Sequence, residues 1–336
     1  MKTYSPLFII LLLILSGCGA ARMNFNVLTP APITIPSDIQ TIAIIDRSLP
    51  EDTDLNRLES ILTLEGPQLA RAARQNVMEG LKISLTNSTR YNIILTNEMF
   101  LGSSRGSVLP DPLPWNLIDE MAAKHSADVI VCLEAFDSDF IIAAAKLPTR
   151  NNPGAGAGGI ATVNCGFRMY WPEQRMIADE FRFSHSMNWS AGGPAIIAAI
   201  NTVKVRSDAI NGASREAGIS YGRRITPTWY RVSRDYFKKG GGNADLAAGA
   251  RMMQLNDWDK AIPSLVRATE TGNKKARGRA AHNLAVVYEI LGDLHAAKEW
   301  TTVSWGMYRQ KKSKHYGYIL TQRIIEQENL DYQLQR

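Results

Sequence analysis

Short runs of apolar residues alternate, over the first two thirds of the chain, with segments whose apolar residues have a helical period. The runs predict strands at 41–46, 91–95 and 128–133, and the last of these can extend to Ala145. Because helical segments separate these strands along the chain, we expect them to pair in parallel.

Two amphipathic helices are predicted between these strands. Apolar residues recur every four positions in the segment 67–86, at Leu69, Ala73, Val77, Leu81 and Leu85, which gives one apolar face. A loop rich in Gly, Ser and Pro follows at 102–114. The second helix is expected from Trp115 to about Lys124, directly after Pro114, because proline is tolerated in the first turn of a helix.

A predicted hairpin completes the first domain. The β-rich runs 162–171 and 176–189 are joined by Pro172-Glu173-Gln174-Arg175, a typical turn sequence. A helix from Pro194 to about Ala217 follows. The order β-α-β-α-β-β-β-α therefore predicts a mixed α/β domain over residues 38–222, with antiparallel strands added to a parallel sheet.

Residues 223–336 are predicted to form an all-α domain. Pro227–Phe237 is expected to be one helix, ended by Gly240-Gly241-Gly242, and everything after Asn243 is expected to be helical. This domain contains an internal repeat with an offset of 36 residues, which aligns Asn256-Asp257-Trp258 with Gly292-Asp293-Leu294.

The repeated positions have a direct physical meaning. Asn256-Asp257 and Gly292-Asp293 are suited to a tight turn and to capping the helix that follows. Small residues let paired helices approach closely, and large residues fill the gaps between pairs. The residues predicted to pack the repeats are Gly249, Met252, Trp258, Ala261, Leu265, Ala285, Tyr288, Gly292 and Ala297.

The second copy, Leu284-Ala285-x-x-Tyr288-x-x-x-Gly292-Asp293-Leu294-x-x-Ala297, resembles the tetratricopeptide repeat (TPR). The copies are expected at about 243–275 and 278–311, with capping helices on both sides. Pro263, inside a predicted helix of the first copy, departs from the pattern. The resemblance implies a groove that binds a peptide or a partner protein, and a generic bundle of helical hairpins is the alternative.

The amino terminus has the pattern of a bacterial lipoprotein signal. Lys2 precedes an apolar run that ends at Leu15, and Ser16-Gly17-Cys18 follows. We expect cleavage between Gly17 and Cys18, removal of residues 1–17, lipid on Cys18, and a tether over 18–37. A plain signal anchor is the alternative. The expected location is the cell envelope, at the outer membrane and facing the periplasm.

Charge and cysteine content narrow the expected partners. The net charge of +6 suits anionic lipid headgroups or acidic partners, and no nucleic acid is expected as a partner. Basic residues gather in two clusters, Arg223, Arg224, Arg231, Arg234, Lys238 and Lys239 in the first and Arg309, Lys311, Lys312 and Lys314 in the second. Cys132 and Cys165 can form a disulfide or remain two buried free thiols.

Sequence motifs give no support for catalysis, a metal or a cofactor. Gly102-Ser103-Ser104-Arg105-Gly106 matches G-x-S-x-G, but no helix follows it. Gly154 to Gly159 contains G-x-G-x-x-G, but a strand follows, so a mobile hairpin loop is expected. None of the five histidines has a second histidine four residues away, and neither remaining cysteine has a C-x-x-C neighbour.

The function predicted from these observations is that of a non-enzymatic scaffold or assembly factor in the cell envelope. The order of elements in the first domain is similar to that of TolB-type and curli-secretion-type lipoprotein domains, a fold that mediates envelope protein contacts. The whole layout resembles uncharacterised bacterial lipoproteins that pair such a domain with carboxyl-terminal repeats. The alternatives are an envelope hydrolase, or a module that binds glycans or small ligands.

Overall fold

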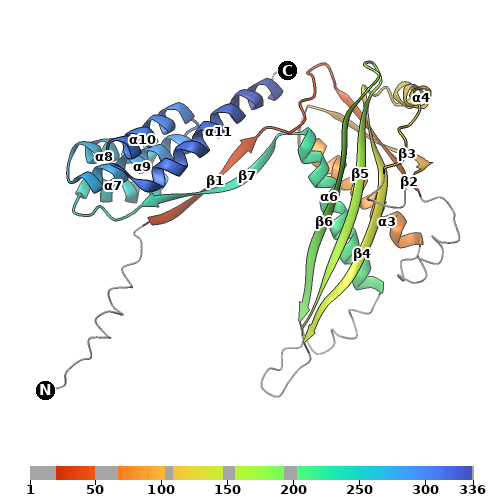
Figure 1. Cartoon of the computed structure of the whole chain (residues 1–336), viewed down its shortest axis with the longest axis horizontal. Coiled ribbons are helices and arrows are strands. Elements are labelled where there is room, and N and C mark those ends of the chain that lie inside the picture. Colours follow the sequence, from red (N-terminus) through yellow and green to blue (C-terminus); the bar gives the residue numbers. More distant parts are fainter. Residues whose placement is uncertain are drawn as a thin grey trace. The chain divides into compact units, whose positions relative to one another are not determined.

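The chain folds into two compact units. Its structure, a computed structural model, describes residues 20–49, 67–88, 90–102, 109–146, 156–192 and 203–334. The helical unit comprises Met1–Pro30 and Trp229–Tyr332, and the α/β unit comprises Ala31–Thr228 and Gln333–Arg336. Each unit is described by itself (Figure 1).

The α/β unit is built on a five-stranded mixed sheet. The strands are β2 (Thr41–Leu49), β3 (Asn92–Leu101), β4 (Val129–Lys146), β5 (Gly156–Trp171) and β6 (Met176–Gly192), in the order β3-β2-β4-β5-β6. β2 pairs in parallel with β3 and β4, whereas β5 pairs antiparallel with β4 and β6. The predicted fold class and the predicted combination of parallel and antiparallel strands are confirmed.

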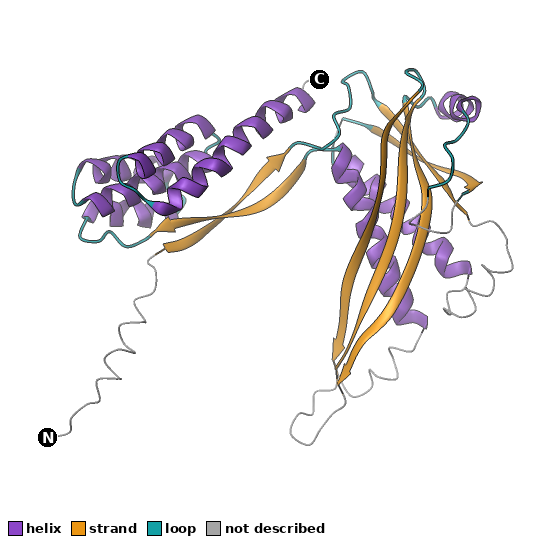
Figure 2. Cartoon of the chain, in the orientation of Figure 1, coloured by secondary structure: helices purple, strands orange, loops and turns teal. Residues whose placement is uncertain are grey.

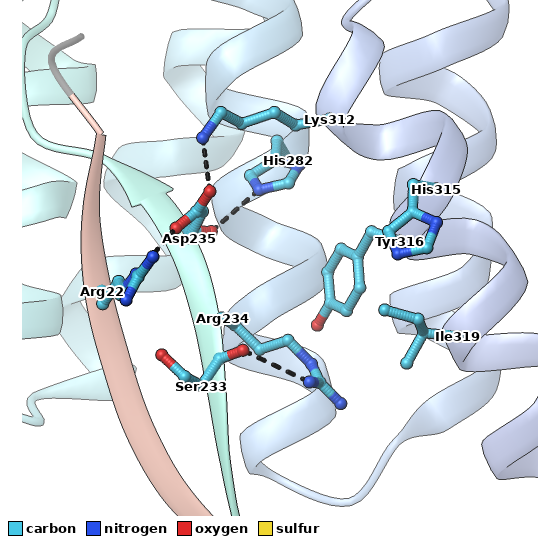
Figure 3. Close-up of a pocket in the computed structure, with 9 residues that line it drawn as sticks. All are labelled: Arg22, Ser233, Arg234, Asp235, His282, Lys312, His315, Tyr316 and Ile319. Carbon is cyan, nitrogen blue, oxygen red and sulfur yellow. Dashed lines mark hydrogen bonds and ion pairs between the residues drawn. The ribbon is translucent and has the colours of Figure 1, made fainter.

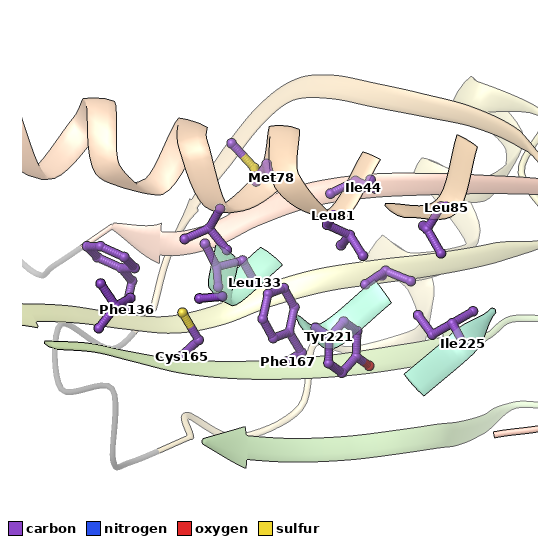
Figure 4. Close-up of a cluster of buried hydrophobic side chains, with 14 of the residues drawn as sticks. Ile44, Met78, Leu81, Leu85, Leu133, Phe136, Cys165, Phe167, Tyr221 and Ile225 are labelled. Carbon is purple, nitrogen blue, oxygen red and sulfur yellow. The ribbon is translucent and has the colours of Figure 1, made fainter. Parts of the chain in front are cut away.

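Helices cover the two faces of the sheet unequally (Figure 2). α3 (Pro67–Thr86) and α6 (Val203–Ile225) lie on one face, over a large cluster of buried residues that includes Leu81, Leu133 and Phe167 (Figure 4). Phe167 stacks on Tyr221 of α6 with ring centroids 4.1 Å apart. α4 (Trp115–His125) covers a smaller cluster on the other face.

α3 and α6 touch through their glycines. A Cβ atom on Gly80 would lie 2.0 Å from the carbonyl oxygen of Arg215, and one on Gly218 would lie 1.9 Å from that of Val77. Only residues without a side chain allow the two backbones to come this close.

The helical unit combines five helices with a two-stranded ribbon. The helices are α7 (Ala244–Gln254), α8 (Trp258–Glu270), α9 (Lys274–Ile290), α10 (Leu294–Gly306) and α11 (Lys311–Leu334). The ribbon pairs β1 (Ala20–Thr29) with β7 (Thr228–Phe237), and its strands run in opposite directions (Figure 1).

The predicted turns of the internal repeat are confirmed. Asn256 and Gly292 have φ angles of 54° and 86°, and each stands at the turn between two helices. The side chains of Asp257 and Asp293 accept hydrogen bonds from the backbone N–H groups of Lys260 and Ala296, so they cap α8 and α10.

Two predictions about the helical unit are wrong. Residues 227–237 were expected to form a helix, but Thr228–Phe237 form β7, and the expected tether 18–37 contains β1. The residues Trp229, Tyr230 and Val232 favour a strand. In the ribbon, the backbone N–H and C=O groups of each strand find hydrogen-bond partners in the other strand, about 200 residues away in the chain. Local periodicity cannot reveal such a partner.

Three further expectations in the α/β unit change. The last helix ends at Ile225 rather than near Ala217, and the start expected at Pro194 lies outside the described residues. Gly156–Gly159 lie in β5, paired with both β4 and β6, and not in a loop. Cys132 and Cys165 are buried free thiols; they belong to clusters on opposite faces of the sheet, so a bridge between them is excluded in this fold.

Candidate functional site

A cavity of about 460 Å³ lies in the helical unit, between the ribbon and helices α9 and α11 (Figure 3). The residues that line it come from four elements: Arg22 of β1; Ser233, Arg234 and Asp235 of β7; His282 of α9; and Lys312, His315, Tyr316 and Ile319 of α11. A volume of this size is in the range of small-ligand pockets.

Asp235 is the carboxylate at the centre of the cavity wall. It forms an ion pair with Lys312, and the Arg22 Nε atom lies 3.8 Å from its other carboxylate oxygen (Figure 3). Both cations are partly or largely exposed to solvent. Two cations therefore share one carboxylate at the mouth of the cavity.

Glu289 of α9 does not line the cavity, but it binds two residues that do, Arg234 and Tyr316. Its fully buried carboxylate accepts hydrogen bonds from Arg234 at 2.7 and 2.8 Å, from Arg323 at 2.7 Å and from the Tyr316 hydroxyl. Burial opposes ionisation of Glu289, but these hydrogen bonds and the Arg234 charge outweigh it and lower its pKa. Burial, followed by the Glu289 charge, raises the pKa of Tyr316 well above its usual value.

Asn283 and His282 attach β7 to α9. The Asn283 side chain accepts from the Phe237 N–H at 2.8 Å and donates to the Phe237 carbonyl at 2.9 Å, as a neighbouring strand would. His282 Nε2 lies 2.9 Å from the Asp235 carbonyl oxygen. Since a carbonyl oxygen can only accept, Nε2 carries the proton.

Ser313 and His282 form a hydroxyl–imidazole pair behind the cavity: His282 lines it, and Ser313 does not. The Ser313 Oγ lies 2.8 Å from His282 Nδ1, and Ser304 Oγ lies 2.7 Å from Ser313 Oγ. Burial lowers the pKa of His282 to about 4, so the ring is neutral at pH 7. A serine beside a neutral histidine has the geometry of a nucleophile and its base, but Ser313 is only 1% exposed and His282 only 2%.

Cations outnumber carboxylates around this cavity. Among the described residues, the ion pairs join four cationic side chains, Arg22, Arg234, Lys312 and Arg323, to the two carboxylates of Asp235 and Glu289. The chemical consequence is an attraction for anions, since a ligand with a carboxylate can supply the charge that the protein does not.

A second buried carboxylate lies in the α/β unit. Glu134 accepts hydrogen bonds from Arg47 at 2.8 Å and from the Tyr170 hydroxyl, and Arg168 lies 3.7 Å away. Arg168 also pairs with Glu180 at 2.7 Å. The backbone of the loop before α4 closes this group, because the carbonyls of Pro110 and Asp111 accept from Arg168 and Arg47.

The predicted site residues do not line the cavity. All but one of the repeat-packing positions lie instead within the apolar interior of the helices: Ala261, Leu265, Ala285 and Ala297 are buried, and Met252, Trp258 and Tyr288 pack against the same cluster. The prediction is wrong for Gly292, which is exposed at the turn before α10, where a Cβ atom would have no neighbour within 4 Å. A Cβ atom on Gly249 would lie 2.6 Å from the Leu265 side chain. Gly17 and Cys18 lie outside the described residues.

Sequence reasoning missed His282, Asn283 and Glu289 as functional positions. All three are polar residues on an otherwise apolar face of α9, between Ala280 and Ile290. This was a usable signal, because polar groups are buried at a cost unless they have partners. The basic clusters did contain Arg234 and Lys312, which the structure brings to one cavity.

The described residues form neither a metal-binding cluster nor a membrane-spanning helix. The described residues contain no group of three or more His, Cys, Asp or Glu side chains placed to hold a metal ion. Within the same part of the chain, none of the helices is both long enough and apolar enough to cross a membrane.

Solved structures that match part of this chain include three from bacteria, each with low sequence identity and a low TM-score. A protein described as a neuraminyllactose-binding hemagglutinin homolog from Helicobacter pylori has 10% identity and a TM-score of 0.28, covering 58% of this chain and 87% of that chain. The PelC dodecamer from Paraburkholderia phytofirmans has 8% identity and a TM-score of 0.22, covering 61% and 98%. A minor lipoprotein from Acinetobacter baumannii has 11% identity and a TM-score of 0.27, covering 56% and 92%.

Family models match both units. No curated protein matches the chain. The model described as a domain of unknown function (DUF6340) matches residues 247–326, which span most of the helices. The model described as a domain of unknown function (DUF8603) matches residues 39–237. Because that match covers more than half of the 336 residues, the chain belongs to the DUF8603 family.

Proposed function

We propose that this chain is a lipid-anchored cell-envelope protein that binds an acidic segment of a protein partner in the cavity of the helical unit, without catalysis. The excess of cations around Asp235 and Glu289 is the observation that carries this proposal. An acidic ligand would balance this charge, and a neutral ligand would not.

A peptide segment suits the cavity better than an isolated ion. Ile319 and the ring of Tyr316 form an apolar part of the wall of the same cavity that Lys312 and Arg22 line. Such a wall can hold an apolar side chain next to an acidic one, which an inorganic anion does not offer. The resemblance of the helical hairpins to tetratricopeptide repeats supports the same class of ligand.

Anisotropy of fluorescein-labelled peptides tests the binding proposal. The probes are a peptide of alternating Glu and Leu and a matched peptide of alternating Gln and Leu, added to the full chain in detergent. We expect the acidic peptide to bind at least about tenfold more tightly, and its affinity to fall as salt is added. Equal affinities for the two peptides would refute the proposal.

Two lysine variants locate the binding site. Lys312→Gln removes a cavity cation and should weaken binding of the acidic peptide by about tenfold. Lys275→Gln is the matched control, because Lys275 is exposed in the first turn of α9 and does not line the cavity. If both variants weaken binding equally, the effect is nonspecific charge attraction and the cavity is not the site.

The anchor has its own test. The Ser16-Gly17-Cys18 sequence supports lipidation at Cys18, and several acyl chains hold a protein firmly to a bilayer where one does not. Cys18→Ala should move the protein from the membrane fraction to the soluble fraction. Unchanged membrane association would contradict a lipid tether.

An envelope hydrolase remains the second candidate, and the Ser313–His282 pair is the observation that favours it. Burial of both side chains argues against it, because a substrate carbonyl has to reach the serine hydroxyl. Hydrolysis of p-nitrophenyl acetate that depends on Ser313 would support the hydrolase. We expect instead the same background rate for the wild type and Ser313→Ala.

A further inference from the structure

The outward face of α11 carries a row of exposed apolar side chains. Tyr318, Ile325 and Tyr332 are 65%, 48% and 63% exposed. They are spaced by seven residues, or about two helical turns, so they lie along one line of the helix. Single exposed apolar residues are ordinary, but three at heptad spacing along one line of a helix indicate a face that a second helix can cover.

Charges on either side of this row change sign along the helix. Lys314 and His315 lie near the start of α11, and Glu326 and Glu328 lie near its end. At about 100° per residue, Lys314 and Glu328 lie on one flank of the row, while His315 and Glu326 lie on the other. The helix is therefore basic at one end and acidic at the other, on both flanks.

We infer that this face binds the same face of a second copy of the chain, with the two α11 helices antiparallel. A two-fold axis near Thr321 brings Tyr318 of one copy onto Ile325 of the other. The same axis places Lys314 opposite Glu328 of the second copy, and His315 opposite Glu326. These three pairings require nearly the same centre, between residues 320 and 322, so one register satisfies both flanks and two residues of the apolar row. The third, Tyr332, then lies opposite Lys311 of the second copy, at the start of its α11.

Charge distinguishes this arrangement from a parallel one. Parallel pairing about a two-fold axis would bring opposite flanks together. Lys314 would then lie beside His315 of the second copy and Glu328 beside Glu326 of the second copy, which places basic residues together and acidic residues together and is unfavourable. The antiparallel register replaces each of these contacts with an attractive one.

A small cavity beside the row offers a place for a side chain of the second copy. It has a volume of about 240 Å³, lies between α10 and α11, and is lined by Trp305, Lys314 and Tyr318 among others. Packing of an apolar side chain into a hole on the facing helix is the usual way in which helix pairs gain specificity. The second copy's Ile325 is opposite Tyr318, at the edge of this cavity.

Charge reversal tests the proposal and controls for folding. Sedimentation equilibrium of the full chain in density-matched detergent should show a reversible dimer. Lys314→Glu and Glu328→Lys should each raise the dimer dissociation constant by at least about tenfold, and the double variant should restore it. A monomeric wild type, or a double variant no better than the singles, would overturn the proposal.

Cysteine cross-linking tests the direction of the helices. Thr321→Cys lies beside the proposed axis and should give a disulfide-linked dimer under mild oxidation. Lys311→Cys is the control, because two such residues would lie roughly 30 Å apart in an antiparallel pair. Efficient cross-linking of both variants would indicate parallel helices and overturn the inference. A wild-type chain that is monomeric but co-purifies with another protein, and loses that protein in Lys314→Glu, would also overturn it.

Discussion

Glu134 in the α/β unit and Glu289 in the helical unit are built from the same chemical parts. Each carboxylate is fully buried, and each has two arginines and one tyrosine hydroxyl around it. Around Glu134, two arginines face two carboxylates, Glu134 and Glu180, and loop carbonyls take further arginine protons. Around Glu289 and Asp235, four cations face two carboxylates beside an open cavity.

The difference shows how one motif serves two purposes. A buried carboxylate with balanced charges and backbone partners joins strands to a loop and leaves no charge for a ligand. The same carboxylate with extra cations and a cavity next to it still stabilises its unit, but the group as a whole attracts an anion. The Glu134 and Glu289 clusters contain the same residue types, so what distinguishes a structural cluster from a binding site here is its charge balance and its access to solvent.

The largest expected effect on stability comes from removing the buried negative charge of Glu289 or of Glu134. Glu289→Gln and Glu134→Gln should each lower the free energy of unfolding of their own unit by about 3 kcal/mol, because arginines are left buried without their carboxylate. Native-state hydrogen exchange of the α9 and β4 amides would measure the two losses separately.

The two variants should then differ in rescue by a ligand. Saturating acidic Glu/Leu peptide should restore part of the protection of α9 in Glu289→Gln, because the cavity is open and the cations remain. It should leave β4 in Glu134→Gln unchanged. Equal rescue of both variants, or rescue of neither, would break the distinction between a binding site and a structural cluster.

The second prediction concerns pH. The pKa of His282 is about 4 in the fold, below the ordinary value of about 6.5, so the unfolded chain binds more protons between these values. Stability from this group is fully present above pH 6.5 and falls as the pH approaches 4, with about 2 kcal/mol lost between pH 7 and pH 5.

Hydrogen exchange at several pH values checks this sign. The stability difference between the wild type and His282→Gln, measured on α9 amides, should shrink by that amount as the pH is lowered from 7 to 5. The β4 amides serve as the internal reference. A difference that stays constant with pH would mean that the buried ring keeps its ordinary pKa.

The third prediction compares glycines in the two units. Gly218→Ala places a Cβ against the Val77 carbonyl oxygen, which cannot move without α3, and should cost about 2 kcal/mol. Gly249→Ala meets the movable Leu265 side chain, and the better helix propensity of alanine offsets the strain, so the change should stay within about 1 kcal/mol. Denaturation midpoints of the two variants measure these losses. A larger loss for Gly249→Ala than for Gly218→Ala would contradict this description of the packing.

The smallest expected effect on stability belongs to Arg22→Gln. The Arg22 side chain is 80% exposed and its ion pair with Asp235 is long, so the free energy of unfolding should change by less than about 0.5 kcal/mol. Acidic-peptide affinity should still fall about two- to threefold, as anisotropy would show. A loss of stability without a loss of affinity would make Arg22 a structural residue rather than part of the binding site.

Most of the α/β unit follows from local pattern. Leu69, Ala73, Val77, Leu81 and Leu85 define α3, and apolar runs and a turn sequence define β2, β4 and the β5–β6 hairpin. The ribbon could not be predicted in the same way, although Arg22, Asn24 and Asn26 of β1 alternate with Met23, Phe25 and Val27. A strand of this kind needs a partner, and its partner is distant in the sequence.

The candidate site was out of reach for the same physical reason. Arg22, Asp235, His282 and Lys312 come from four elements, and only the ribbon and the stacked helices bring them together. Single residues did carry partial signals, such as the polar Glu289 within an apolar helix. Their charge balance depends on three-dimensional neighbours, and a single sequence does not specify those neighbours.

The pairing of β1 with β7 also has a consequence for the order of folding. Because the α/β unit is inserted between the two strands, β1 leaves the ribosome about 200 residues before its partner. The α/β unit, whose paired elements are closer in sequence, can form first and bring the ends of the long connection together, which lowers the entropy cost of closing it. The ribbon, and with it the cavity wall that Arg22 and Asp235 share, is then a late structure, complete only after nearly three quarters of the chain has been made.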